Sequence, residues 1–101
     1  MTYWLSVLVP PRPTFASDMT DDERALMLEH VRYWRGQMEK GKVLAFGPVL
    51  HPRAEFGGVA LLTLDGGEDP DAYARADPAI LADVGFRFEA FPMPQLVRSD
   101  R

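Results

Sequence analysis

One long amphipathic helix, flanked on both sides by short apolar runs, most constrains the fold of this chain. Thr20 to Glu23 matches the capping-box pattern that begins helices, and acidic residues fill the first turn. The helix is expected to continue to about Lys40 and to end at Gly41. At about 100° per residue, one side collects Met27, Val31, Trp34 and Met38, with Leu26, His30, Tyr33 and Gln37 beside them. Such a helix needs a second layer to pack against.

Strands are predicted on both sides of this helix. The first is an aromatic and β-branched run over residues 3–9, which Pro10 ends. After the helix, residues 42–46, 59–64 and 84–91 are expected to form the others, and residues 13–18 to form a loop. Asp69-Pro70 and Asp77-Pro78 each place a capping residue before a proline, a pattern typical of helix starts. We therefore expect short helices over 70–76 and 78–81.

The resulting βαββαβ order predicts an α+β fold of the ferredoxin-like type, a four-stranded antiparallel sheet with two helices on one face. Both sides of the first strand are apolar, with Tyr3 and Leu5 on one side and Trp4 and Leu8 on the other. A water-exposed sheet face normally alternates with polar residues, so another copy of the chain is expected to cover the second face. The 101 residues suit one domain, with a folded core over 1–95 and a polar tail over 96–101.

The composition argues against several classes of protein. Eleven Lys and Arg against fifteen Asp and Glu give a net charge of −4, so nucleic acid is not an expected partner. The absence of cysteine excludes disulfides and thiolate metal sites. No apolar run is long enough to span a membrane and no signal peptide is recognisable, so a cytoplasmic protein is expected. The two histidines lack metal-ligand spacing and the glycines lack phosphate-binding patterns, so neither a metal nor another cofactor is predicted.

His30 and Asp77 are the candidates for chemistry. His30 is expected to face inward, and an imidazole exchanges protons near neutral pH, although a core histidine with a satisfied partner fits the same pattern. Asp77 fits a helix cap equally well, and one carboxylate can both cap a helix and orient an imidazole. His51 is interpreted as a solvated loop histidine.

The order and spacing of several short motifs over about residues 3–91 resemble the YCII-related family. These motifs are the helix carrying His30, Gly41-Lys42-Val43 leading to Phe46-Gly47-Pro48, the strand from Gly58, and Asp77-Pro78. The resemblance implies a ferredoxin-like unit that dimerises through its sheet, as in the dimeric α/β barrels. It also implies that His30 and Asp77 form the dyad proposed as the active site of this family. The proline-rich segment 10–13 departs from the simplest members and is expected to reshape the mouth of the pocket.

These observations favour a small cofactor-free enzyme of isomerase or lyase type, acting on a small cyclic or aromatic carbonyl-type substrate. His30 would serve as general acid or base and Asp77 would orient it. Substrate contacts are expected from Tyr33, Trp34, Phe46 and Pro48, although the aromatic residues would suit core packing as well. The alternative is a non-catalytic small-molecule-binding or assembly module of the dimeric α/β-barrel type.

Overall fold

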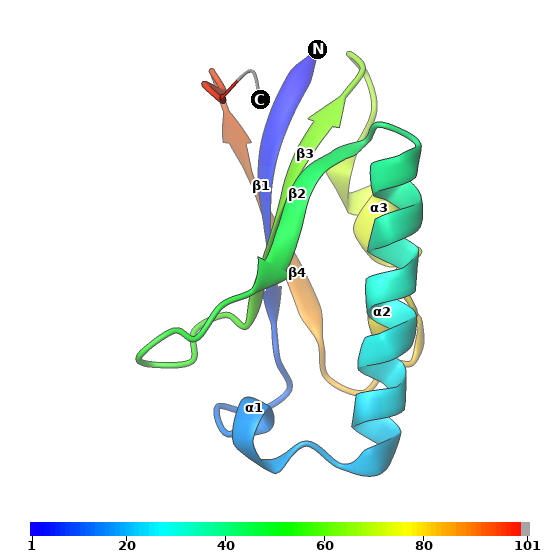
Figure 1. Ribbon diagram of the computed structural model, residues 1–101, viewed down its shortest axis with the longest axis vertical. Coiled ribbons are helices and arrows are strands. Elements are labelled where there is room, and N and C mark those ends of the chain that lie inside the picture. Colours follow the sequence, from blue (N-terminus) through cyan, green and yellow to red (C-terminus); the bar gives the residue numbers. More distant parts are fainter. Residues whose placement is uncertain (100–101) are drawn as a thin grey trace.

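The computed structural model describes residues 1–99, so residues 100–101 of the expected tail lie outside it. Its helices and strands follow one another along the chain as β1 (Thr2–Val9), α1 (Phe15–Asp18), α2 (Asp21–Glu39), β2 (Val43–Pro48), β3 (Gly58–Leu64), α3 (Pro70–Arg75), α4 (Pro78–Leu81) and β4 (Arg87–Met93). The strands form one antiparallel sheet in the order β2-β3-β1-β4. The long helix α2 crosses one side of this sheet, and α3 lies on the same side (Figure 1). The predicted ferredoxin-like α+β fold is confirmed.

Helix α2 begins where the capping box predicts. The Thr20 hydroxyl accepts a hydrogen bond from the Glu23 backbone N–H at 3.1 Å, and a Glu23 carboxylate oxygen accepts from the Thr20 N–H at 2.9 Å. The helix ends with Lys40 as its C-cap, and the next residue, Gly41, has a φ of 78°, as expected of a glycine stop. Met38, expected on the core side, is 38% exposed near this end of the helix.

The core lies between α2 and the sheet. Trp34 of α2 is 1% exposed and packs with Leu62 and Leu64 of β3, which are equally buried. Cross-strand pairing places Trp4 of β1 opposite Leu62, so both point toward the helices. The neighbouring positions of β1 therefore face the other side of the sheet, which no helix covers in Figure 1.

The segment 13–18 was expected to be a loop. In the structure it contains the short helix α1. Phe15 is 7% exposed and meets Phe86 edge to face, with ring centroids 5.1 Å apart. This contact forms a second core cluster with Leu8 and Ala79. The segment folds onto the end of the sheet because it carries this aromatic anchor.

The boundaries of the two edge strands, β2 and β4, also differ from the prediction. β2 includes Pro48 and β4 includes Pro92, because each is an edge strand, where a missing backbone N–H need not break a ladder. β4 starts at Arg87 instead of residue 84, since the chain turns through left-handed conformations at Asp83 (φ 54°) and Gly85 (φ 102°). A Cβ at Gly85 would lie 3.0 Å from Pro11, so glycine also permits this close approach.

Candidate active site

His30 and Asp77, 47 residues apart, form a direct hydrogen bond. His30 lies midway along α2, and Asp77 occupies the junction between α3 and α4. The distance between His30 Nδ1 and Asp77 Oδ2 is 2.6 Å. The Asp77 side chain is fully buried, whereas 16% of the His30 side chain remains exposed. The fold thus places a buried carboxylate beside an imidazole that is itself partly accessible.

Asp77 accepts two further hydrogen bonds. Trp34 Nε1 donates to Oδ2 at 2.6 Å, and the Ala79 backbone N–H donates to Oδ1 at 2.8 Å, which caps α4. No Lys or Arg among residues 1–99 forms an ion pair with this carboxylate. The carboxylate is held by these donors because an isolated buried charge would be costly.

The pair determines which nitrogen of a neutral His30 is available. An ionised carboxylate only accepts hydrogen bonds, so the ring carries its hydrogen on Nδ1 and leaves a lone pair on Nε2. His30 Nε2 has no hydrogen-bond partner in the part of the chain that the structure describes. Chemically, the arrangement is an imidazole oriented by a carboxylate, with its second nitrogen free to exchange a proton.

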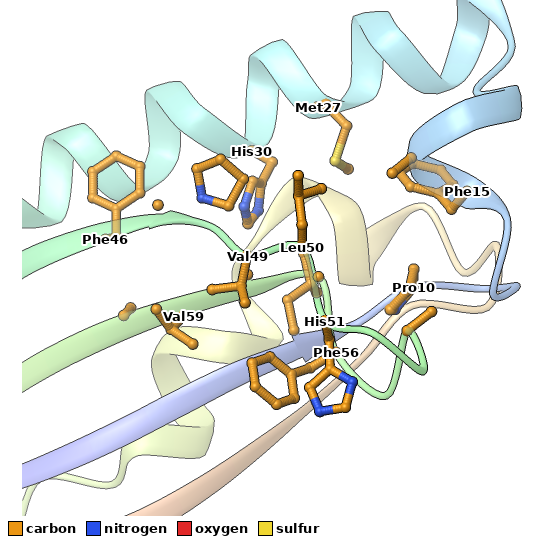
Figure 2. A pocket seen from close by; sticks show the side chains of 18 of the residues that line it. Pro10, Phe15, Met27, His30, Phe46, Val49, Leu50, His51, Phe56 and Val59 are labelled. Atoms are coloured by element: carbon orange, nitrogen blue, oxygen red, sulfur yellow. The ribbon is translucent and has the colours of Figure 1, made fainter.

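A cavity of about 390 Å³ opens beside His30. Figure 2 shows His30 pointing from α2 toward Val49 and Leu50, with Met27 and Phe15 farther along the helix side. The volume lies in the range of small-molecule sites. Its lining residues come from α2, the segment 8–19, β4 and the β2–β3 region: Leu8, Pro10, Pro13, Phe15, Ala16, Met19, Met27, His30, Val31, Trp34, Phe46, Gly47, Pro48, Val49, Leu50, His51, Ala54, Phe56, Gly57, Gly58, Val59, Ala60 and Phe88.

Three of the four residues expected at a substrate pocket, Trp34, Phe46 and Pro48, line this cavity. Tyr33 does not. Its hydroxyl donates to the Tyr73 backbone carbonyl at 2.6 Å, and its side chain borders a separate polar depression. Burial raises the pKa of Tyr33 to about 12, and the negative charge of Asp77 adds to this shift. Tyr33 therefore joins α2 to α3 and is not part of the cavity wall.

His51 is a cavity residue that the sequence interpretation missed. Instead of being solvated, its side chain is 17% exposed and packs on Phe56 with ring centroids 4.9 Å apart. Both side chains lie along the β2–β3 connection in Figure 2. The sequence did contain a signal for this burial, because the apolar residues Val49, Leu50 and Phe56 lie close to His51 along the chain.

The proline-rich segment forms one wall of the cavity. Pro10, Pro13 and Phe15 contribute to the lining, together with Ala16 and Met19. Residues 10–13 were expected to reshape the pocket mouth, and Pro10 and Pro13 lie in the cavity wall. Residues 1–99 contain no group of three or more His, Asp or Glu side chains placed to hold a metal ion.

Comparison with known proteins identifies the family. The family model described as the YCII-related domain matches residues 4–94, nearly the whole chain. The chain belongs to the YCII-related family. The residues that carried the resemblance, His30 and Asp77 among them, all lie within the matched range.

A solved structure is similar to this YCII-related protein over most of both chains. It is 5-chloro-2-hydroxyhydroquinone dehydrochlorinase (TftG) from Burkholderia phenoliruptrix, in complex with 2,5-dihydroxybenzoquinone. The TM-score is 0.57 at 14% sequence identity, and the match covers 88% of this chain and 91% of the other. At this identity the similarity establishes the shared fold. No curated protein sequence matches the chain. Of the helices that the structure describes in this YCII-related protein, none is long and apolar enough to cross a membrane.

Proposed function

We propose that this YCII-related protein is a cofactor-free enzyme that moves a proton on a small cyclic or aromatic carbonyl-type substrate. The observation that carries the proposal is the 2.6 Å contact between His30 Nδ1 and Asp77 Oδ2, with the opposite edge of the imidazole at an apolar cavity. An imidazole oriented by a buried carboxylate is suited to general acid–base catalysis.

In the proposed reaction, His30 Nε2 takes a proton from a carbon next to the carbonyl group. The imidazolium that forms is stabilised by Asp77, which accepts the hydrogen bond from Nδ1 throughout. Returning the proton to a different atom gives an isomerisation, and loss of a leaving group from the neighbouring carbon gives an elimination. General acid–base catalysis supplies roughly 10²- to 10⁴-fold, so an activated substrate suits this site.

The structurally similar TftG supports this choice of reaction and substrate. TftG is a dehydrochlorinase, and its structure was solved in complex with 2,5-dihydroxybenzoquinone. A ring compound of that kind has a carbonyl group and an aromatic-sized body. The cavity beside His30 has the volume for a ring of that size.

A second candidate function is a ligand-binding or assembly module without turnover. The bonds from Trp34 and Ala79 to Asp77 favour it, because they give the carboxylate a structural role that needs no catalysis. The two functions differ in what the loss of His30 does to proton transfer.

The test is hydrogen–deuterium exchange in deuterated water, followed by NMR, on a set of cyclic ketones, lactones and hydroxyquinones. Proton abstraction by His30 would exchange the hydrogens next to the carbonyl even if no later step occurred. We expect His30→Ala to lower the exchange rate at least about a hundredfold. The matched control is His51→Ala, which removes the other imidazole of the cavity and is expected to retain exchange.

Circular dichroism and thermal unfolding of both variants would exclude a folding defect. Exchange that continues at the wild-type rate in folded His30→Ala would overturn the enzyme proposal and leave the binding module.

A further inference from the structure

We infer that the cavity binds ring compounds in their uncharged form, through one O–H group donated to His30 Nε2, and excludes carboxylates. This inference rests on the proposed function for the choice of site, and it adds the charge and the hydrogen-bonding class of the ligand. Its evidence is the chemistry of the cavity wall.

Almost no polar side chains line the cavity. None of its described lining residues is Lys, Arg, Asp, Glu, Ser, Thr, Asn, Gln or Tyr. The side-chain hydrogen-bonding groups that remain belong to Trp34, His30 and His51. The indole N–H of Trp34 is already donated to Asp77 at 2.6 Å. Backbone groups apart, a ligand therefore meets one of the two imidazoles or an apolar surface.

His51 contacts two residues of its own loop through its ring nitrogens. Its Nδ1 accepts a hydrogen bond from the Arg53 backbone N–H at 3.1 Å, and its Nε2 lies 3.7 Å from a Glu55 carboxylate oxygen. Figure 2 shows the ring beside Phe56, away from His30. Because Nδ1 accepts, Nε2 of a neutral His51 carries the hydrogen and can only donate. Among the described side chains that line the cavity, His30 Nε2 is thus the imidazole acceptor left for a ligand.

The state of this atom determines which ligand group it recognises. Asp77 accepts the Nδ1 hydrogen of His30, so a neutral ring presents a lone pair at Nε2. The complementary group is a hydrogen-bond donor, such as the O–H of a phenol or an enol. Phenols ionise near pH 10, so they enter at neutral pH without charge.

Two energetic costs would lower the affinity of the cavity for a carboxylate. It would lose its hydration in an apolar cavity where no Lys or Arg is among the described lining residues. Among the described lining side chains, a positive charge could come only from a protonated imidazole, that of His30 or His51, so a carboxylate paired with a cation would require the uptake of one proton. An uncharged hydroxyl compound avoids both costs.

Three ligands of similar size test this inference by isothermal titration calorimetry at neutral pH: p-cresol, p-methylanisole and p-toluate. The anisole lacks the O–H donor, and we expect it to bind about fivefold more weakly than p-cresol, the value of one neutral hydrogen bond. The toluate carries a carboxylate, and we expect it to bind at least about a hundredfold more weakly. Equal affinity for p-cresol and the anisole, or a toluate affinity near that of p-cresol, would overturn the inference.

Two variants, His30→Leu and His51→Ala, test which imidazole accepts the hydrogen bond from the ligand hydroxyl. In His30→Leu the preference for p-cresol over the anisole should fall to about one, since a single hydrogen bond is removed. His51→Ala should keep the preference, because the acceptor nitrogen of His51, Nδ1, already takes the Arg53 N–H and cannot accept from the ligand hydroxyl. A preference that survives in His30→Leu and disappears in His51→Ala would overturn the inference. If His30→Leu fails to fold, the wild-type ligand series still decides.

The inference and the proposed function fail in different ways. Tight, proton-coupled binding of p-toluate together with His30-dependent exchange would refute the inference and keep the proposed function. A p-cresol preference that depends on His30, without exchange on any carbonyl compound, would refute the proposed function and keep the inference.

Discussion

At the scale of single residues, Asp77 combines a structural contact with a chemical one. Its Oδ1 caps α4 through the Ala79 N–H, and its Oδ2 accepts hydrogen bonds from His30 and Trp34. The sequence suggested both capping and orientation for this residue, and the geometry allows them together because each carboxylate oxygen serves different donors. A substitution of the acceptor, Asp77, compared with a substitution of one donor, Trp34, can separate the two contributions.

Asp77→Asn should lower proton exchange much more than Trp34→Phe does. An asparagine oxygen can still cap α4, but its amide hydrogens would face His30 Nδ1 and favour the imidazole hydrogen on Nε2, where the base is needed. The same amide group would leave the Trp34 indole N–H without its acceptor. We expect at least about a hundredfold lower exchange for Asp77→Asn. Trp34→Phe leaves the His30 contact intact and should cost about 2–4 kcal/mol of stability through a lost hydrogen bond and a core void.

The measurements are exchange rates by NMR and free energies of unfolding from urea titrations. The nitrogen chemical shifts of the labelled imidazole would show the change of tautomer directly. Equal losses of exchange in the two variants, matching their losses of stability, would contradict an orienting role for Asp77.

At the scale of elements, Arg12 ties the cavity wall to the long helix. Its guanidinium donates to both carboxylate oxygens of Glu23 at 2.7 and 2.8 Å, and to a carboxylate oxygen of Asp18 at 2.8 Å. Glu23 lies in the first turn of α2, and Asp18 ends α1. The wall segment between Pro10 and Met19 is thereby held against α2.

The hydrogen bonds of Arg12 to Glu23 and Asp18, called the Arg12 clamp below, affect how the free energy of unfolding changes at acid pH. The hydrogen bonds from Arg12, followed by that from the Thr20 backbone, lower the pKa of Glu23 from 4.5 to about 2. A carboxyl whose pKa is lower in the folded state stabilises the fold above its unfolded pKa, and this contribution is lost as the pH falls through the folded value. The window for Glu23 is therefore between pH 4.5 and about 2.

Arg12→Gln should flatten the decline of the unfolding free energy across this window, because the carboxyl of Glu23 then titrates closer to its ordinary pKa. Urea denaturation at a series of pH values measures the effect. Arg87→Gln removes the same charge from an exposed pair with Glu89 on β4 and should keep the wild-type profile. Identical acid profiles for Arg12→Gln and the wild type would show that the clamp does not stabilise the fold in this way.

The sequence predicted the elements that carry their own local signals. The capping box at Thr20 and the Asp-Pro pairs specify helix starts within a few residues, and the structure confirms them. Helix α1 was missed because it depends on the contact between Phe15 and Phe86, 71 residues apart. His30 and Asp77 could be chosen as candidates, but their 2.6 Å contact depends on how α2 packs beside α4. His51 was misjudged for the same reason, since its burial comes from the folded loop.

At the scale of the whole molecule, the open face of the sheet is the feature that a single chain does not explain. Leu5 of β1 pairs with Leu61 of β3 and Phe91 of β4, and all three point away from the helices. Phe91 is 48% exposed. We propose that a second copy of the chain covers this face, since exposed apolar surfaces of this kind mark interaction sites.

Phe91→Lys should convert such a homodimer into monomers, because the lysine would place an unpaired charge inside an apolar interface. Sedimentation equilibrium of the wild type and the variant measures the change in mass. Leu81→Lys is the matched control, since Leu81 is 68% exposed on α4, on the helical side, and its replacement should leave the dimer intact. A wild-type chain that sediments as a monomer, or a dimer broken by Leu81→Lys and kept by Phe91→Lys, would rule out the sheet face. In the second of these outcomes, the dimer would form through the helical side, where Leu81 lies on α4.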